Sequence, residues 1–207
     1  GKIHSMCGRY ANHVHNMADW VEILGDWPGD AVLSMDIAPT QNIPVVVNEP
    51  DGPATKTMRW GLVPAWSKTP KPRYATFNAR IESVQQKPAF RSAFARSQAC
   101  LVPASGYYEW TGEKGHKIRH YIQMQDASPL VMAGLWEYWE QGSEHLYSCT
   151  NLTRPALPSI AGLHPRMPLI LGTDQARNWL QQPLAGQLEQ LKRYDDYRLV
   201  ETVPQSP

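Results

Sequence analysis

Proline and glycine recur throughout this chain and favour rigid loops between its structural elements. The 207 residues include 18 prolines and 14 glycines. Proline lacks the backbone donor that a helix interior or a central strand requires. Strand-like runs cover residues 43–47, 55–63, 117–125, 129–139, 145–150 and 199–203, with two shorter pieces around 103–106. The chain is therefore expected to be β-rich.

Short helices are expected at four places among these strands. They cover residues 16–24, 88–96, 174–180 and 187–191. Asn16 is predicted to cap the first, and Pro88 suits the first turn of the second. Strands outnumber helices and rarely alternate with them, which predicts an α+β fold with a largely antiparallel, barrel-like sheet and a few peripheral short helices. Ile118, Ile122 and Met124 recur at period two and are expected to share one buried face.

The charge and cysteine content restrict the function. The chain has 20 basic and 19 acidic residues, so the whole molecule has no field that attracts a polyanion, and any nucleic-acid site must be a local groove. Three cysteines without CxxC spacing argue against a disulfide framework and a structural zinc site. We expect no metal or other cofactor. No apolar run reaches the length of a membrane span, so a cytoplasmic protein with no membrane partner is expected.

Cys7 is the first candidate for chemistry. A lone cysteine in such a protein is commonly a small buried hydrophobe. However, Cys7 follows Met6, and removal of the residues before it would create an N-terminal cysteine. Such a residue carries an amine with a pKa near 7.7–8.0 beside its thiol, and the two groups can capture an aldehyde as a thiazolidine. An internal cysteine cannot do this, because its nitrogen is an amide.

Other polar residues stand in positions that suit either chemistry or structure. Glu109 lies between aromatic residues, where it is either an edge-strand charge or a general acid or base with a raised pKa. His164 stands beside Arg166 and is either a hydrogen-bonded loop histidine or a phosphate or sugar contact. Asn78 and Arg80 alternate along "FNARIES", so they share a face and suit cross-strand pairing or substrate binding equally. Trp66, in a proline-rich loop, either packs or stacks on a base.

Six motifs in chain order resemble the SOS response-associated peptidase (SRAP) family. They are "MCGRY" at 6–10, "IAPTQ" at 37–41, "RWGLVPAW" at 59–66, "FNARIES" at 77–83, "CLVPASGYYEW" at 100–110 and "HPRMPLIL" at 164–171. The likeness runs from residue 6 to about residue 180. It implies a single SRAP-like domain over residues 6–207, with residues 1–5 expected to be a tag remnant.

The resemblance implies an abasic-site sensor in single-stranded DNA. Such a protein forms a covalent crosslink to the abasic sugar through its N-terminal cysteine and protects damaged DNA in the SOS response. By this resemblance we expect a bacterial protein that associates with the nucleoid when bound to DNA. We also expect a monomer, because long DNA must enter an open groove. The resemblance also implies an autoprocessing peptidase activity that exposes the cysteine.

The resemblance assigns roles to nine residues. Cys7 would be the nucleophile, Asn78 would orient it, Glu109 would transfer protons, and His164 would contact the sugar. The residues implied in DNA binding are Arg9, Pro39, Trp66, Arg80 and Arg166. The family usually has asparagine shortly before its "APTQ" segment, but this chain has Asp36, whose carboxylate would oppose a phosphate.

Two other functions fit the same residues. A cysteine peptidase would use Cys7 and His164 as nucleophile and base, with Glu109 orienting the histidine. It would not need a free α-amine. A noncatalytic single-stranded DNA binder would need only the arginines, the proline-rich loop and Trp66.

Overall fold

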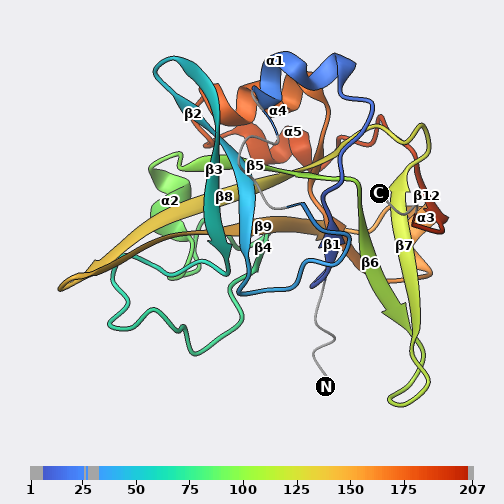
Figure 1. Cartoon of the computed structure of the whole chain (residues 1–207), viewed down its shortest axis with the longest axis horizontal. Helices are drawn as coiled ribbons and strands as arrows, with labels where there is room; N and C mark the ends of the chain where they lie inside the picture. The colour runs from blue at the N-terminus through green and yellow to red at the C-terminus, as the bar shows by residue number, and fades with distance from the viewer. Residues whose placement is uncertain (1–6, 26, 28–32, 205–207) are drawn as a thin grey trace.

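The computed structural model describes residues 7–25, 27 and 33–204, which form two sheets and several short helices (Figure 1). Five strands of the larger sheet close into a barrel in the order β9-β3-β2-β5-β8, because β8 also pairs with β9. Their bounds are β2 Asn42–Glu49, β3 Gly52–Trp60, β5 Ala99–Ala104, β8 Leu130–Gln141 and β9 Glu144–Pro155. All of these pairings are antiparallel except β3 with β9, so the predicted barrel-like α+β fold is confirmed.

Three short strands attach to the outside of this barrel. β4 (Asn78–Arg80) runs parallel to β9, and β10 (Arg166–Pro168) runs antiparallel to it. β11 (Ile170–Leu171) pairs with β8. Two motifs that are far apart in the sequence, at 77–83 and 164–171, are therefore both held by the last residues of β9.

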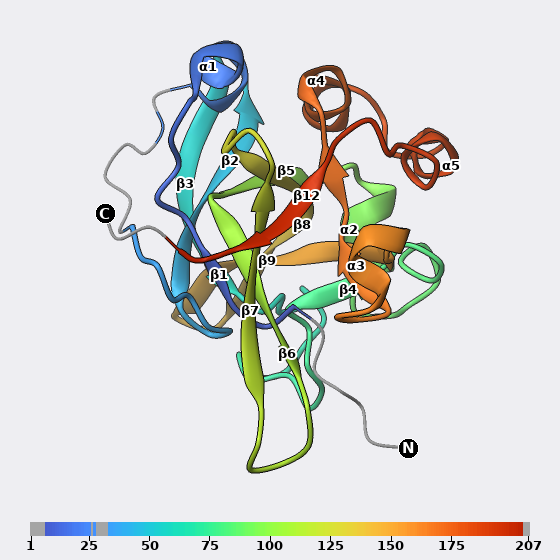
Figure 2. The ribbon, with the colours of Figure 1, turned by 90° about the vertical axis from the view of Figure 1, so that its right-hand side faces the viewer.

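The smaller sheet has the strand order β1-β6-β7-β12 and is antiparallel throughout. Its strands are β1 (Tyr10–Ala11), β6 (Gly106–Thr111), β7 (Ile118–Met124) and β12 (Leu199–Thr202). The β6–β7 hairpin projects beyond the rest of the sheet (Figure 2). β12 pairs with β7 only as far as Tyr121, and Ile118, beyond that pairing, is 62% exposed. The expectation that Ile118 is buried was wrong, whereas Ile122 lies fully in the core.

The helices are short. They are η1 Ala18–Trp20, α1 Val21–Leu24, α2 Arg91–Ala95, α3 Pro158–Ala161, α4 Thr173–Gln181 and α5 Gln187–Leu191. The first helical segment starts two residues later than expected, because Asn16 has a φ of 53° and its side chain donates to Ala127 O instead of capping. None of the helices in the described ranges is long and apolar enough to cross a membrane.

Trp60 joins the barrel to the strands around it. It is fully buried, and its ring meets those of Tyr10 and Phe77 edge-on at centroid distances of 5.2 and 5.7 Å. Its indole Nε1 donates to Phe77 O at 2.9 Å. Edge-to-face pairs of this kind are worth about 0.5–1.5 kcal/mol beyond the area they bury. Trp60 thus fixes β1 and the residue that precedes β4.

Gly106, the first residue of β6, has no room for a side chain. A Cβ there would lie 2.4 Å from the Tyr121 ring and 2.6 Å from Ile122 O. Since part of that clash is with backbone, we expect Gly106→Ala to lower the free energy of unfolding by about 1–3 kcal/mol in urea titrations. Gly162→Ala is the matched control, because its Cβ would meet nothing within 4 Å. Equal stability of the two variants would contradict this account.

Candidate active site

Cys7 and Glu109 meet although they lie 102 residues apart in the chain. β1 pairs with β6 so that Tyr10 lies opposite Tyr107, which brings the residues before β1 alongside Glu109. The backbone N–H of Cys7 donates to Glu109 Oε1 at 2.9 Å. Cys7 is 4% exposed and Glu109 is 2% exposed, so this hydrogen bond is shielded from water.

Burial of Glu109 changes its acidity. Desolvation raises the pKa of its carboxyl to about 7, and the hydrogen bond from the Cys7 backbone opposes part of that rise. A carboxyl with a pKa near neutrality exchanges a proton readily at physiological pH. Of the two interpretations of Glu109, the structure favours the carboxylate in a dry site over the edge-strand surface charge.

The Cys7 thiol is held in its neutral form. Burial raises its pKa well above the ordinary value, and the nearby Glu109 carboxylate raises it further. The backbone of Cys7 has a φ of 29°, a left-handed conformation that is uncommon for any residue with a side chain. Strain of this kind costs about 1–3 kcal/mol and persists only where the surroundings enforce it.

Asn78 and Arg80 lie on β4, as expected for residues that share a face. Asn78 is opposite Asn151, and Arg80 is opposite Thr153. Asn78 is partly buried, whereas the Arg80 side chain is 59% exposed and lies 3.8 Å from Glu82.

His164 is buried in the turn between α3 and β10, with 7% of its surface exposed. Its Nδ1 accepts the backbone N–H of Arg166 at 3.0 Å. Nδ1 also lies 3.2 Å from Arg166 O, so this nitrogen accepts from the Arg166 N–H in one tautomer of the ring and can donate to the Arg166 carbonyl in the other.

The Arg166 guanidinium is held by an ion pair and a backbone hydrogen bond inside the protein. Its two Nη atoms contact the Glu82 carboxylate at 2.6 and 2.9 Å, and Nη2 also donates to Thr153 O at 3.0 Å. The residue is 7% exposed. A bidentate pair of this kind fixes geometry as well as charge. The resulting bridge between β10 and the end of the "FNARIES" motif was not predicted from the sequence.

Arg9 is paired with Asp36, the residue that departs from the family pattern. Tyr10 and Ile37 exchange backbone hydrogen bonds of 3.2 and 2.8 Å, which bring the two segments together. Arg9 Nη1 then lies 3.0 Å from Asp36 Oδ1, with both side chains about half exposed. Pro39 follows in a partly buried turn.

A groove of about 700 Å³ lies between the proline-rich loop and the segment after β4. Among its lining residues are Trp66, Tyr74, Asn78, Arg80 and Lys87. Trp66 is 65% exposed and Tyr74 is 83% exposed, and the Trp66 indole is tethered to Pro88 O at 3.1 Å. The structure therefore brings three of the expected residues, Trp66, Asn78 and Arg80, into one groove.

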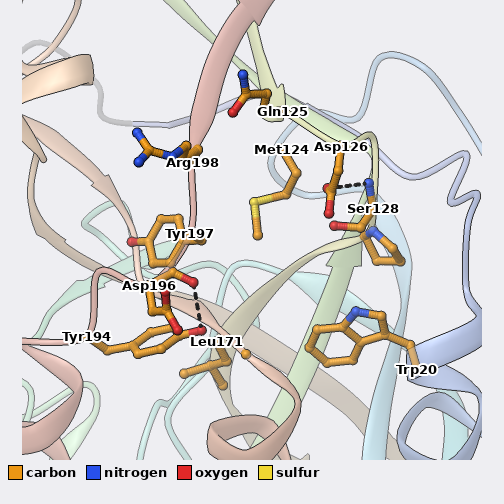
Figure 3. Close-up of a pocket in the computed structure, with 12 residues that line it drawn as sticks. Trp20, Met124, Gln125, Asp126, Ser128, Leu171, Tyr194, Asp196, Tyr197 and Arg198 are labelled. Carbon is orange, nitrogen blue, oxygen red and sulfur yellow. Dashed lines mark hydrogen bonds between the residues drawn. The ribbon is translucent and has the colours of Figure 1, made fainter.

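A second pocket, of about 390 Å³, contains none of the nine expected residues (Figure 3). Trp20 faces Tyr194 and Tyr197 across it, and Arg198 and Asp126 lie nearer its rim. Tyr194 donates to Asp196 O at 3.4 Å, and Asp126 accepts the Ser128 N–H at 3.0 Å.

Tyr107 is a residue that the sequence analysis missed. It is fully buried, and its alternation with Glu109 along β6 places both on one face. Burial raises the pKa of its hydroxyl well above the ordinary value, and Cys7 and Glu109 raise it further. The period-two spacing in "GYYEW" is the signal that would have found it. Across residues 7–25, 27 and 33–204, no three His, Cys, Asp or Glu side chains are placed to hold a metal ion.

Several curated proteins are similar to this chain. The abasic site processing protein YoaM of Bacillus subtilis is 34% identical over 84% of this chain and 79% of its own length. The abasic site processing protein HMCES of Xenopus tropicalis is 32% identical over 71% of this chain and 53% of its own.

Solved structures and a family pattern agree with these relatives. A crystal structure of a Bordetella bronchiseptica protein superimposes with a TM-score of 0.81 at 25% identity, covering 96% of this chain and 100% of that one. A phage-related protein from the same organism has a TM-score of 0.69 at 27% identity, covering 95% and 94%. The pattern described as SOS response associated peptidase (SRAP) matches residues 6–204. With that match over nearly the whole chain, the protein belongs to the SRAP family.

Proposed function

We propose that this protein recognises abasic sites in single-stranded DNA and forms a covalent crosslink to them through Cys7, in the DNA damage response. The observation that carries the proposal is the contact between the Cys7 nitrogen and a buried carboxyl whose pKa is about 7. The relatives named abasic site processing proteins support the choice of substrate. Removal of residues 1–6, by autoprocessing or by another peptidase, is part of the proposal.

The reaction starts when the α-amine of Cys7 attacks the aldehyde carbon of the opened abasic sugar. Loss of water from the adduct gives an imine. The thiol sulfur then adds to the imine carbon, and the thiol proton passes to the imine nitrogen. The product is a five-membered thiazolidine ring that joins protein and DNA. A neutral thiol suits this order of events, because the amine acts first.

The pKa of Glu109 suits it to the proton transfers of this reaction. An α-amine titrates near 7.7–8.0, within about one unit of the pKa of Glu109, so moving a proton between them costs on the order of 1 kcal/mol. Glu109 can therefore take the ammonium proton before attack and return one as water leaves. In its Nε2-protonated tautomer, His164 would donate to the sugar oxygen during ring opening, and Asn78 would orient the sugar.

DNA binding would use the groove and the nearby arginines. Trp66 and Tyr74 offer faces on which bases stack, which is worth about 1–3 kcal/mol per base and tolerates any sequence. Arg80 would contact phosphates directly, with Pro39 lining the site. Arg9 and Arg166, each paired with a carboxylate, would contribute to a smaller extent.

The peptidase alternative fits the same residues less well. In a cysteine peptidase the histidine accepts the thiol proton and a carboxylate orients its ring. Here Glu109 accepts from the Cys7 backbone, His164 Nδ1 is engaged by the Arg166 backbone, and burial disfavours the thiolate. Cleavage of added peptides at a useful rate would favour this alternative over crosslinking.

The crosslink is tested with single-stranded DNA that carries one abasic site. Protein that begins at Cys7 is expected to give a shifted band on a denaturing gel. Cys7→Ala and protein that retains residues 1–6 should give none, because each lacks part of the amine and thiol pair. If the longer form reacts as fast without losing residues, the amine-first mechanism is wrong. If wild type binds DNA without any covalent band, only the noncatalytic binder is left.

The pH dependence tests Glu109. Its ionised fraction falls as the pH drops through about 7, and a neighbouring α-ammonium moves that midpoint lower. The crosslinking rate of wild type should therefore rise with pH through an inflection at or below about 7. Glu109→Gln should lose this inflection and about 10²–10⁴-fold in rate.

Stability provides the control for this variant. Wild type buries a charged carboxylate above pH 7, so stability that is present below about pH 4.5 is lost as the pH rises through about 7. Glu109→Gln should consequently unfold at higher urea than wild type at pH 8. An unchanged pH profile in this folded variant would exclude Glu109 as the proton-transfer group.

Asp36 provides a test of Arg9. Asp36→Asn leaves the guanidinium unpaired, so single-stranded DNA should bind more tightly, and the slope of log affinity against log salt should steepen by about 0.7. Fluorescence anisotropy measures both. Asp51→Asn is the control, because it makes the same charge change in the β2–β3 turn. Equal effects of the two variants would mean that Arg9 does not contact DNA.

A further inference from the structure

The tip of the β6–β7 hairpin is an exposed basic surface. Residues 112–119 are all exposed and contain Lys114, Lys117 and Arg119 against one acidic residue, Glu113. Because the whole chain has 20 basic and 19 acidic residues, the remainder carries an excess of acidic ones. The hairpin tip is therefore a local basic region of a chain that is nearly neutral as a whole.

The tip has a defined shape. Gly112 and Gly115 have φ values of 90° and 94°, and His116 N–H donates to Glu113 O at 2.9 Å. A Cβ at Gly112 would lie 2.4 Å from His116 O, so only glycine fits there. At its base, the Arg119 guanidinium lies 4.6 Å from the centroid of the Tyr108 ring. The basic side chains are thus carried on an ordered turn.

The proline-rich loop forms a second basic arm on the same side of the molecule. Residues 64–76 contain Lys68, Lys71 and Arg73 and no acidic residue, and all three are exposed. Figures 1 and 2 both show this loop and the β6–β7 hairpin projecting beyond the sheets in the same direction. The α4 and α5 helices lie at the opposite end.

Each arm continues directly into a strand of the candidate active site. The loop leads through Phe77 into Asn78 of β4, and the hairpin is the extension of β6 beyond Glu109. Glu113 follows Glu109 by four residues, of which only Trp110 and Thr111 belong to β6, so at most about 14 Å of chain separates the two carboxyl-bearing residues.

We infer that the hairpin tip binds the phosphate backbone of the DNA on one side of the lesion. The DNA on the other side of the lesion would run along the proline-rich loop. The inference rests on the proposed function and adds a second point of DNA contact to it. Lys114 and Lys117 would each neutralise one phosphate. The tip would then add affinity only for DNA that extends several nucleotides from the abasic site.

The test uses single-stranded DNA with a tetrahydrofuran abasic analogue, which lacks the aldehyde and reports binding alone. One oligonucleotide has about two nucleotides on each side of the lesion, and another has about ten, which reach the tip. The variant is Lys114→Ala/Lys117→Ala. The control is Arg177→Ala/Lys192→Ala, which removes two cations from α4 and the end of α5.

On the long oligonucleotide, the hairpin variant should lose about 1.4 from the slope of log affinity against log salt. A rise from about 50 to 200 mM salt should then weaken its binding about 7-fold less than that of wild type. The short oligonucleotide should show no difference. Lys114→Glu/Lys117→Glu should weaken binding to the long oligonucleotide further.

Two results would overturn the inference. One is a slope for the hairpin variant that equals the slope of the α4–α5 control on long DNA. The other is an equal loss on short and long DNA, which the tip cannot cause from its distance. Failure of the proposed function looks different, because wild type would then form no covalent band with reactive abasic DNA, whatever the length dependence of binding.

Discussion

The last residues of β9 determine where Asn78, Arg80 and Arg166 of the candidate site lie. β9 closes the barrel with β8 and β3, and its end then holds β4 and β10 by their backbones. Thr153 is opposite Arg80 in one pairing and Pro168 in the other. A one-residue slip of either strand would turn its side chains to the other face. One strand therefore both closes the barrel and places β4 and β10, whereas the β1–β6 pairing of the smaller sheet brings Cys7 to Glu109.

Burial of its acidic groups is the second property that determines the chemistry of this site. Glu109, Tyr107 and the Cys7 thiol are each buried, and burial is the largest cause of the raised pKa of all three. The Tyr107 hydroxyl and the Cys7 thiol therefore stay neutral at pH 7, whereas Glu109, with a pKa of about 7, is present in both protonation states. Exposed cations lie on Arg80 and the two basic arms, which suits a ligand that is anionic along its length.

Much of the fold could be predicted because its causes are local. Proline and β-branched residues define the strands, and the helix at Gln187–Leu191 matches the expected range. Asn16 and Ile118 were misjudged because tertiary neighbours decide them: Ala127 binds the first, and the limited reach of β12 exposes the second. The pairing of Arg166 with Glu82 likewise depends on strand positions that the sequence does not display.

The contact between Cys7 and Glu109 also has a consequence for how the protein is made. These residues are 102 positions apart, and ribosomes add about 5–20 residues per second, so Glu109 is synthesised roughly 5–20 s after Cys7. For roughly the first half of its synthesis, the chain therefore carries a cysteine without the carboxyl that contacts it in the finished fold.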